Sequence, residues 1–112
     1  MTISGWIYPR NTMVGWPDLD AFFGMRNDID SDFYILQLGG YKLEGRLRTD
    51  IGVSTIVTDL GAISPETWHH IALVYDGSTI MLYIDGLPAG SSNASGQIPD
   101  PSISFYIGSL SY

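Results

Sequence analysis

The stretch Thr67–Gly77, "TWHHIALVYDG", decides the fold of this chain. It runs through the apolar residues Ile71–Tyr75 and ends in an Asp-Gly dipeptide. A short apolar run of this kind, bounded by turn residues, is typical of an inner strand covered on both faces. After the Asp-Gly the chain enters a second apolar segment, Ile80–Ile84. Because Asp-Gly between two such segments is the strongest local signal of a β-hairpin, the stretch predicts a pair of antiparallel strands.

The rest of the chain repeats this pattern. Short segments rich in Ile, Val, Thr, Tyr and Phe alternate with clusters of Gly, Pro, Ser, Asn and Asp, which predicts an all-β sandwich without helices. We expect strands at Thr2–Tyr8, Ala21–Arg26, Phe33–Leu38, Lys42–Thr49, Ser54–Thr58, His69–Tyr75, Ile80–Ile84 and Ser104–Gly108. All six prolines are expected outside strands, because proline cannot donate a ladder hydrogen bond. The segment 90–101, "GSSNASGQIPDP", is expected to be one long surface loop.

Composition limits the kinds of partner. A chain of 112 residues that is 45% hydrophobic is long enough for one domain, 1–112, with its own core. Its formal net charge of -7 would repel nucleic acid and anionic membranes, so neither is expected as a partner. No apolar run is long enough for membrane insertion, and no signal peptide is recognisable, so any export signal is expected outside this chain. The absence of cysteine excludes disulfides and thiolate chemistry.

Two adjacent histidines, His69 and His70, raise the question of a metal or catalytic site. Because side chains alternate along a strand, the two rings must point to opposite faces and cannot bind one metal ion together. We expect His70 to share the inner face with Trp68 and to form a hydrogen bond in the core, with His69 nearer the surface. Trp6 and Trp68 are expected to be buried, since both fall on strands.

Four segments together resemble the laminin G-like branch of the concanavalin A-like lectin/glucanase superfamily. They are "TISGWIYPR", "TWHHIALVYDG", "IMLYIDGLPAG" and "FYIGS", and the spacing Trp-x-His-x-Ala-x-Val-x-Asp-Gly is the most specific part. The resemblance implies a two-sheet antiparallel jelly-roll sandwich. Relative to the family the chain looks truncated at both ends, because a strand before "TISGW" and one after "YIGS" are missing. Edges exposed in this way predict a homo-oligomer or a strand-swapped dimer.

The same superfamily includes glucanases, so catalysis has to be considered. Retaining glycoside hydrolysis needs two carboxyl groups about 5 Å apart. The chain has two glutamates, Glu44 and Glu66, and neither has a second acid at the spacing that the family uses. It also lacks the Gly-x-Ser-x-Gly elbow of serine hydrolases. We therefore expect a protein that is not an enzyme.

Alternating acids at Asp28, Asp30 and Asp32 resemble the start of an EF-hand loop. The residues that follow exclude that motif, because a phenylalanine stands where glycine is needed and Gly39 where a bidentate acid is needed. The laminin G-like resemblance implies a different calcium site, which maps onto Asp32 and, in a later loop, onto Asn93. The alternative is that these acids form an ordinary solvated hairpin loop.

A sugar-binding site usually combines an aromatic face with a few fixed polar groups. The loop "VGWPDLD" offers Trp16 beside Asp18 and Asp20, and we predict these as ligand-binding residues. Arg26 and Tyr41 are weaker additions to the same prediction. The alternative for Trp16 is that it closes the end of the sandwich.

Two classes of function remain. The first is a lectin-like, carbohydrate-binding module, displayed outside the cell or at its surface, or appended to a larger protein. The second is an adhesion or self-assembly domain whose partners are extracellular proteins or further copies of this chain. Both are implied by the resemblance, because a fold alone does not determine function.

Overall fold

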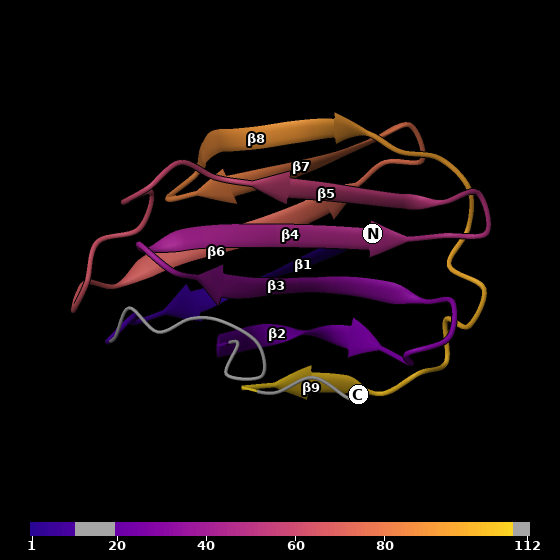
Figure 1. Cartoon of the computed structure of the whole chain (residues 1–112), viewed down its shortest axis with the longest axis horizontal. Coiled ribbons are helices and arrows are strands. Elements are labelled where there is room, and N and C mark those ends of the chain that lie inside the picture. Colours follow the sequence, from indigo (N-terminus) through magenta and orange to yellow (C-terminus); the bar gives the residue numbers. More distant parts are fainter. Residues whose placement is uncertain (11–19, 109–112) are drawn as a thin grey trace.

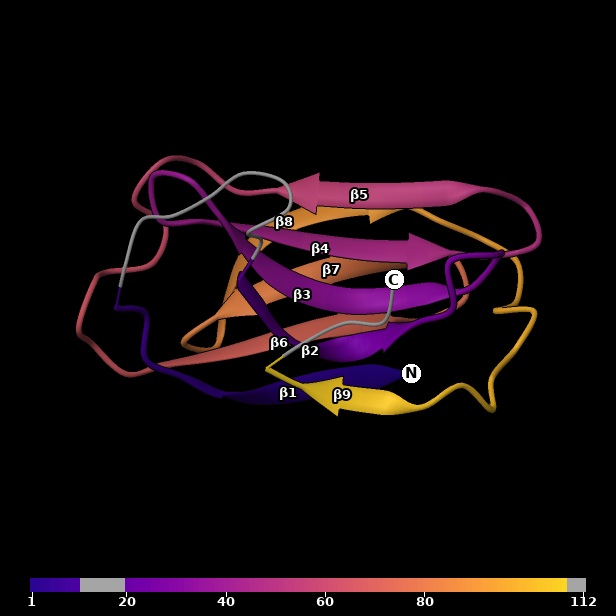
Figure 2. The ribbon, with the colours of Figure 1, turned by 60° about the horizontal axis from the view of Figure 1, so that its bottom comes forward.

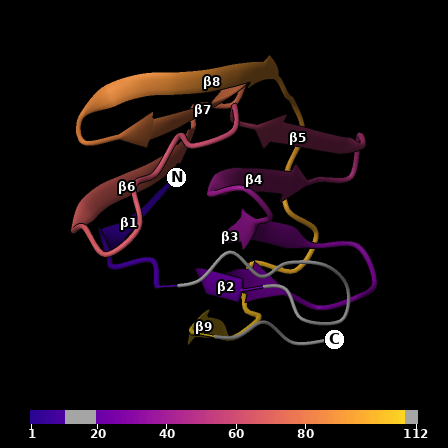
Figure 3. The ribbon, with the colours of Figure 1, turned by 60° about the vertical axis from the view of Figure 1, so that its left-hand side comes forward.

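The computed structural model describes residues 1–10 and 20–108, in which nine strands form two antiparallel sheets and no helix occurs (Figure 1). The strands are β1 (Thr2–Ile7), β2 (Asp20–Arg26), β3 (Asp32–Leu38), β4 (Lys42–Arg48), β5 (Val53–Val57), β6 (His69–Tyr75), β7 (Thr79–Ile84), β8 (Leu87–Asn93) and β9 (Phe105–Ile107). The strand order is β1-β6-β7-β8 in one sheet and β5-β4-β3-β2-β9 in the other. Figure 3 shows the two sheets as separate layers, which is the expected sandwich. Within the described ranges no helix could cross a membrane.

The core lies between the two sheets and is built from alternate residues of the inner strands. In β6 the buried residues are His69, Ile71, Leu73 and Tyr75, and the residues between them are only partly buried. The prediction that the apolar run in β6 is covered on both faces was therefore wrong for its outer face. Burial on both faces occurs instead in β3, where every residue from Asp32 to Gln37 is buried.

One strand, β8, was missed by the sequence patterns. It covers Leu87–Asn93, so Pro88 lies inside a strand and the predicted loop 90–101 begins within one. The sequence did not predict this strand because it is rich in small and polar residues, which have low β propensity. Proline is tolerated there because β8 is an edge strand, and Pro88 pairs with Tyr83 at a shift in register.

The two sides of the sandwich differ. On one side β5 approaches β8: Ser54 Oγ donates a hydrogen bond to the Asn93 carbonyl oxygen at 2.9 Å, and a Cβ on Gly90 would lie 2.5 Å from Ile56 Cγ2. Glycine at position 90 thus allows the two edge strands to meet. On the other side the edge strands are β1 and β9, as Figure 2 shows.

Candidate aromatic binding site

Four aromatic rings gather on the outer face of the four-stranded sheet, where β1 ends and β6 begins. Trp6 lies opposite His70 in the register, and their ring centroids are 5.4 Å apart in an edge-on arrangement. Tyr8 and Trp68 follow at the next position, with centroids 5.3 Å apart. Trp6 is 66% exposed and Trp68 is 62% exposed. We call these four residues the aromatic platform.

The platform corrects three predictions made from the sequence. His69 and His70 do point to opposite faces, but His69 is the buried one and His70 is on the outer face with Trp6. Trp6 and Trp68, expected in the core, are exposed. For His69, His70 and Trp68 the error has one cause: shifting a strand's phase by one residue exchanges every inward side chain for an outward one.

His69 fixes the turn that leads into the platform. Its Nε2 accepts a hydrogen bond from the Ser64 N–H at 2.9 Å, so the ring proton lies on Nδ1, which donates to Asp85 Oδ2 at 2.7 Å. Asp85 Oδ1 also accepts the His70 N–H at 3.0 Å. The His69 side chain and the His70 N–H hold the pKa of Asp85 below its usual value. These bonds anchor both ends of the segment that positions Trp68.

A backbone bond joins the two halves of the platform. The Glu66 N–H donates to the Pro9 carbonyl oxygen at 2.7 Å, which ties the turn before Trp68 to the residue after Tyr8. The Arg10 guanidinium lies 5.3 Å from the centroid of the Tyr8 ring, within range of a cation–π interaction. Tyr8, Arg10 and Trp68 line a groove of about 340 Å³. The site therefore combines exposed rings, a cation and a fixed backbone.

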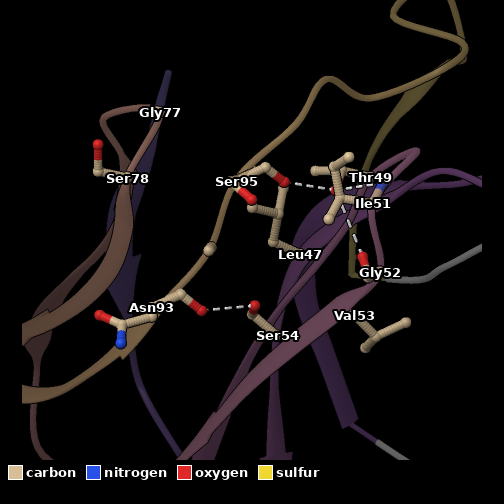
Figure 4. Close-up of a pocket in the computed structure, with 11 residues that line it drawn as sticks. Leu47, Thr49, Ile51, Gly52, Val53, Ser54, Gly77, Ser78, Asn93 and Ser95 are labelled. Atoms are coloured by element: carbon tan, nitrogen blue, oxygen red, sulfur yellow. Dashed lines mark hydrogen bonds between the residues drawn. The ribbon is translucent and has the colours of Figure 1, made fainter.

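A second, polar groove of about 490 Å³ lies at the opposite end of the sandwich, between the β4–β5 turn and the end of β8 (Figure 4). Hydroxyl and amide groups line it, but several already join the sheets. Thr49 Oγ1 donates to the Ser95 carbonyl oxygen at 2.6 Å, and Ser54 donates to Asn93 as described above. Among the residues that the structure describes, no aromatic ring lines this groove. Its hydroxyl groups thus hold the end of the sandwich together.

Of the ligand-binding residues predicted from the sequence, those that the structure describes are not part of the platform. Trp16 and Asp18 lie outside the described residues, and Asp20 begins β2. Arg26 pairs with acidic side chains of the β2–β3 loop and of β3. Tyr41 packs against the hydrophobic core with a positive φ of 56°. A ligand role for these five residues stays a prediction.

The calcium site also stays a prediction. Asp32 is 1% exposed, and its carboxylate lies 3.1 Å from Arg46 Nε and 3.7 Å from Arg26 Nε. Asn93 lines the polar groove, whereas Asp32 does not. In the β2–β3 loop, Asn27 Oδ1 accepts three backbone N–H groups, from residues 29–31. Across residues 1–10 and 20–108 no cluster of three or more His, Cys, Asp or Glu is arranged to hold a metal ion.

The two glutamates lie on different parts of the fold. Glu44 is on β4 of the five-stranded sheet, whereas Glu66 precedes β6 of the four-stranded sheet. Burial raises the pKa of Glu44, and Arg46 and Tyr34 act in the opposite direction. Burial also raises the pKa of Tyr34 to about 12. The Glu44 carboxyl group thus sits beside a phenol and a guanidinium group.

Residues 1–111 match the laminin G-like family model described as the concanavalin A-like lectin/glucanases superfamily. The chain belongs to this family. The match covers nearly the whole chain and, with the two-sheet sandwich, confirms the resemblance and the fold predicted from the sequence. A comparison with curated protein sequences gives no match. Membership of the family supports a ligand-binding module in general.

Proposed function

We propose that this laminin G-like domain binds carbohydrate on the aromatic platform. The observation that carries the proposal is the grouping of exposed rings, in which Trp6 is 66% and Trp68 62% exposed. Large apolar side chains that are exposed together mark binding surfaces. Tryptophan in particular offers a broad apolar face with a polar N–H, a combination suited to a ligand that alternates C–H and O–H groups.

The platform is fixed before any ligand arrives. The Glu66–Pro9 backbone bond and the His69–Ser64 bond hold the segments that carry Tyr8 and Trp68. A site held in its binding geometry loses less conformational entropy when the ligand binds. Arg10 and the exposed side chain of Glu66 are available for the hydroxyl groups of a sugar. The net charge of -7 favours neutral over anionic glycans.

The proposed activity is binding without hydrolysis. Glu44 lies on β4 and Glu66 in the turn before β6, which belongs to the other sheet, and this placement does not favour the closely spaced acid pair that a retaining glycosidase needs. Laminin G-like domains are typically extracellular, and we place the domain outside the cell or at its surface, alone or within a larger protein. Its partners there would be glycans or glycan-bearing proteins.

A glycan array probed with the purified protein tests the proposal. We expect reproducible binding to neutral glycans from a sample whose circular dichroism shows a folded β protein. The absence of binding to any glycan on the array by such a sample would contradict carbohydrate binding and favour an adhesion domain with protein partners.

The same array tests the calcium prediction when it is run in parallel with millimolar calcium and with chelator. Loss of binding in chelator would support the calcium prediction, and equal binding in both would contradict it.

A further inference from the structure

The four-stranded sheet is built from strands that contain no Asp, Glu, Lys or Arg. The strands β1, β6, β7 and β8 read "TISGWI", "HHIALVY", "TIMLYI" and "LPAGSSN", so the 12 acidic and 5 basic residues of the chain all lie elsewhere. In the other sheet β4 alone, "KLEGRLR", has four of them. Asp85 follows β7, but its carboxylate already accepts hydrogen bonds from His69 Nδ1 and the His70 N–H. In a chain with a net charge of -7, an uncharged face of this kind suits a neutral ligand.

The outer face of this sheet continues from the aromatic platform to Tyr83. On β7 the side chains of Ile80 and Leu82 are 0% exposed and point into the core, so Tyr83, one position later, points outward and is partly exposed. Ala72 of β6 lies directly opposite Tyr83, and His70 of the platform precedes Ala72 by two residues on the same face. Tyr83 is therefore a further aromatic residue on the face that carries the platform.

The distance between the platform and Tyr83 exceeds the size of one sugar. Successive outward residues of a strand are about 7 Å apart, and neighbouring strands lie about 5 Å apart. Trp6 and Tyr83 are separated by one such step along the strands and by two strand spacings, which places their backbones about 12 Å apart. A sugar ring is comparable in size to an indole ring. Contact with Trp6 and Tyr83 at the same time therefore needs a chain of sugars.

Small and hydroxyl-bearing side chains lie between and beside these rings. The row of paired residues that crosses the sheet at Tyr83 runs from Ser4 on β1 through Ala72 on β6. On β8 the exposed Ser91 pairs with the outward-facing Met81, which adds a hydroxyl group to the same face. The small side chains leave room for a ligand close to the sheet, and the hydroxyl groups can donate or accept hydrogen bonds with those of a sugar.

We propose that the aromatic platform is one end of a longer glycan track, which runs from Trp68 and Trp6 past Ala72 to Tyr83 and binds a linear, neutral polysaccharide. This inference rests on the proposed carbohydrate binding and names the class of its ligand. Sugar rings of the polysaccharide pack their C–H faces on Trp6 and on Tyr83, and the sugars between them lie over Ala72. A single terminal sugar would use the platform alone.

The dependence of affinity on chain length tests the glycan track. The probes are β-1,4-linked gluco-, manno- and xylo-oligosaccharides, from disaccharides to hexasaccharides, and calorimetric titration gives each Kd. We expect the hexasaccharide of the best-bound series to bind at least about tenfold more tightly than its disaccharide, because it gains an aromatic contact at Tyr83. Since the four strands carry no charged side chain, the affinity should be equal at low and high salt.

Replacing Tyr83 with alanine removes the far end of the glycan track. The affinity for the hexasaccharide is expected to fall by about tenfold, whereas the affinity for the disaccharide should be unchanged. Tyr106→Ala is the matched control, because it removes a partly exposed ring from the other sheet and should change neither affinity. Should Tyr83→Ala fail to fold, Ala72→Arg gives the same test, since it places a long side chain on the track and removes no ring. Melting temperatures show which variants are folded.

The possible failures of this proposal and of carbohydrate binding itself are distinguishable. Equal affinity of the wild type for disaccharide and hexasaccharide, or a length dependence that persists in the folded Tyr83→Ala and Ala72→Arg variants, would overturn the glycan track alone. Binding to branched or terminal sugars on the array, with none to the linear series, would have the same meaning. A folded protein that binds no glycan would overturn both proposals and would favour a protein ligand for this uncharged face.

Discussion

Alanine in place of both Trp6 and Trp68 is expected to weaken glycan binding by at least about 100-fold. Central interface residues of this kind cost about 2 kcal/mol or more when truncated, and each 1.4 kcal/mol is about tenfold in affinity. Because the rings belong to one platform, their effects will not add fully, so we set the expected loss below the sum. Calorimetric titration with the glycan selected by the array measures the change.

The control for this double variant is Tyr106→Ala. Tyr106 is a partly exposed aromatic residue on β9, in the other sheet, and its replacement should leave the affinity unchanged within error. Both tryptophans are more than half exposed, so the double variant should unfold at nearly the same temperature as the wild type. Full affinity in the folded double variant would show that the platform is not the binding site.

Alanine in place of Phe33 is expected to lower the free energy of unfolding by about 3–5 kcal/mol. The Phe33 side chain is 0% exposed, and its strand lies between β2 and β4 at Met25 and Leu47. Surrounding strands on both sides limit how far the core can collapse into the cavity. Since a domain is usually stable by about 5–15 kcal/mol, the variant would be near the margin of folding.

Urea unfolding followed by circular dichroism measures this loss. The midpoint should fall while the slope with denaturant is unchanged, since the surface exposed on unfolding is nearly the same. Ile29→Ala is the control, because Ile29 is 72% exposed in a loop and should change stability by no more than about 0.5 kcal/mol. A midpoint for Phe33→Ala equal to that of the control would contradict the description of the core.

The sequence predicted the strands that carry strong apolar or β-branched patterns, and the structure contains all eight of those segments among its nine strands. What it could not show in β6 was which face points inward. The run Ile71–Tyr75 has no polar residue to mark the solvent side, so its phase is undetermined by hydrophobicity alone. The placement of His69 and His70 failed for this reason.

The phase of β1, by contrast, was readable. Thr2 and Ser4 are polar residues at even positions of the strand, whereas the odd positions include the apolar Ile3 and Ile7. Trp6 shares the phase of the polar pair, which indicates an outward-facing tryptophan. Trp16 was predicted as the binding aromatic residue instead, because binding residues often lie on loops. The pairing of Trp6 with His70 could not be read from the sequence, because it depends on the register between two distant strands.

The measurement that tests the central claim most directly is a heteronuclear NMR titration of the three tryptophan indole N–H signals with the selected glycan. Phenylalanine substitutions, one at a time, assign the signals to Trp6, Trp16 and Trp68. Carbohydrate binding on the aromatic platform predicts saturable shifts of the Trp6 and Trp68 signals. Saturable shifts of the Trp16 signal alone, with those of Trp6 and Trp68 unmoved, would contradict it.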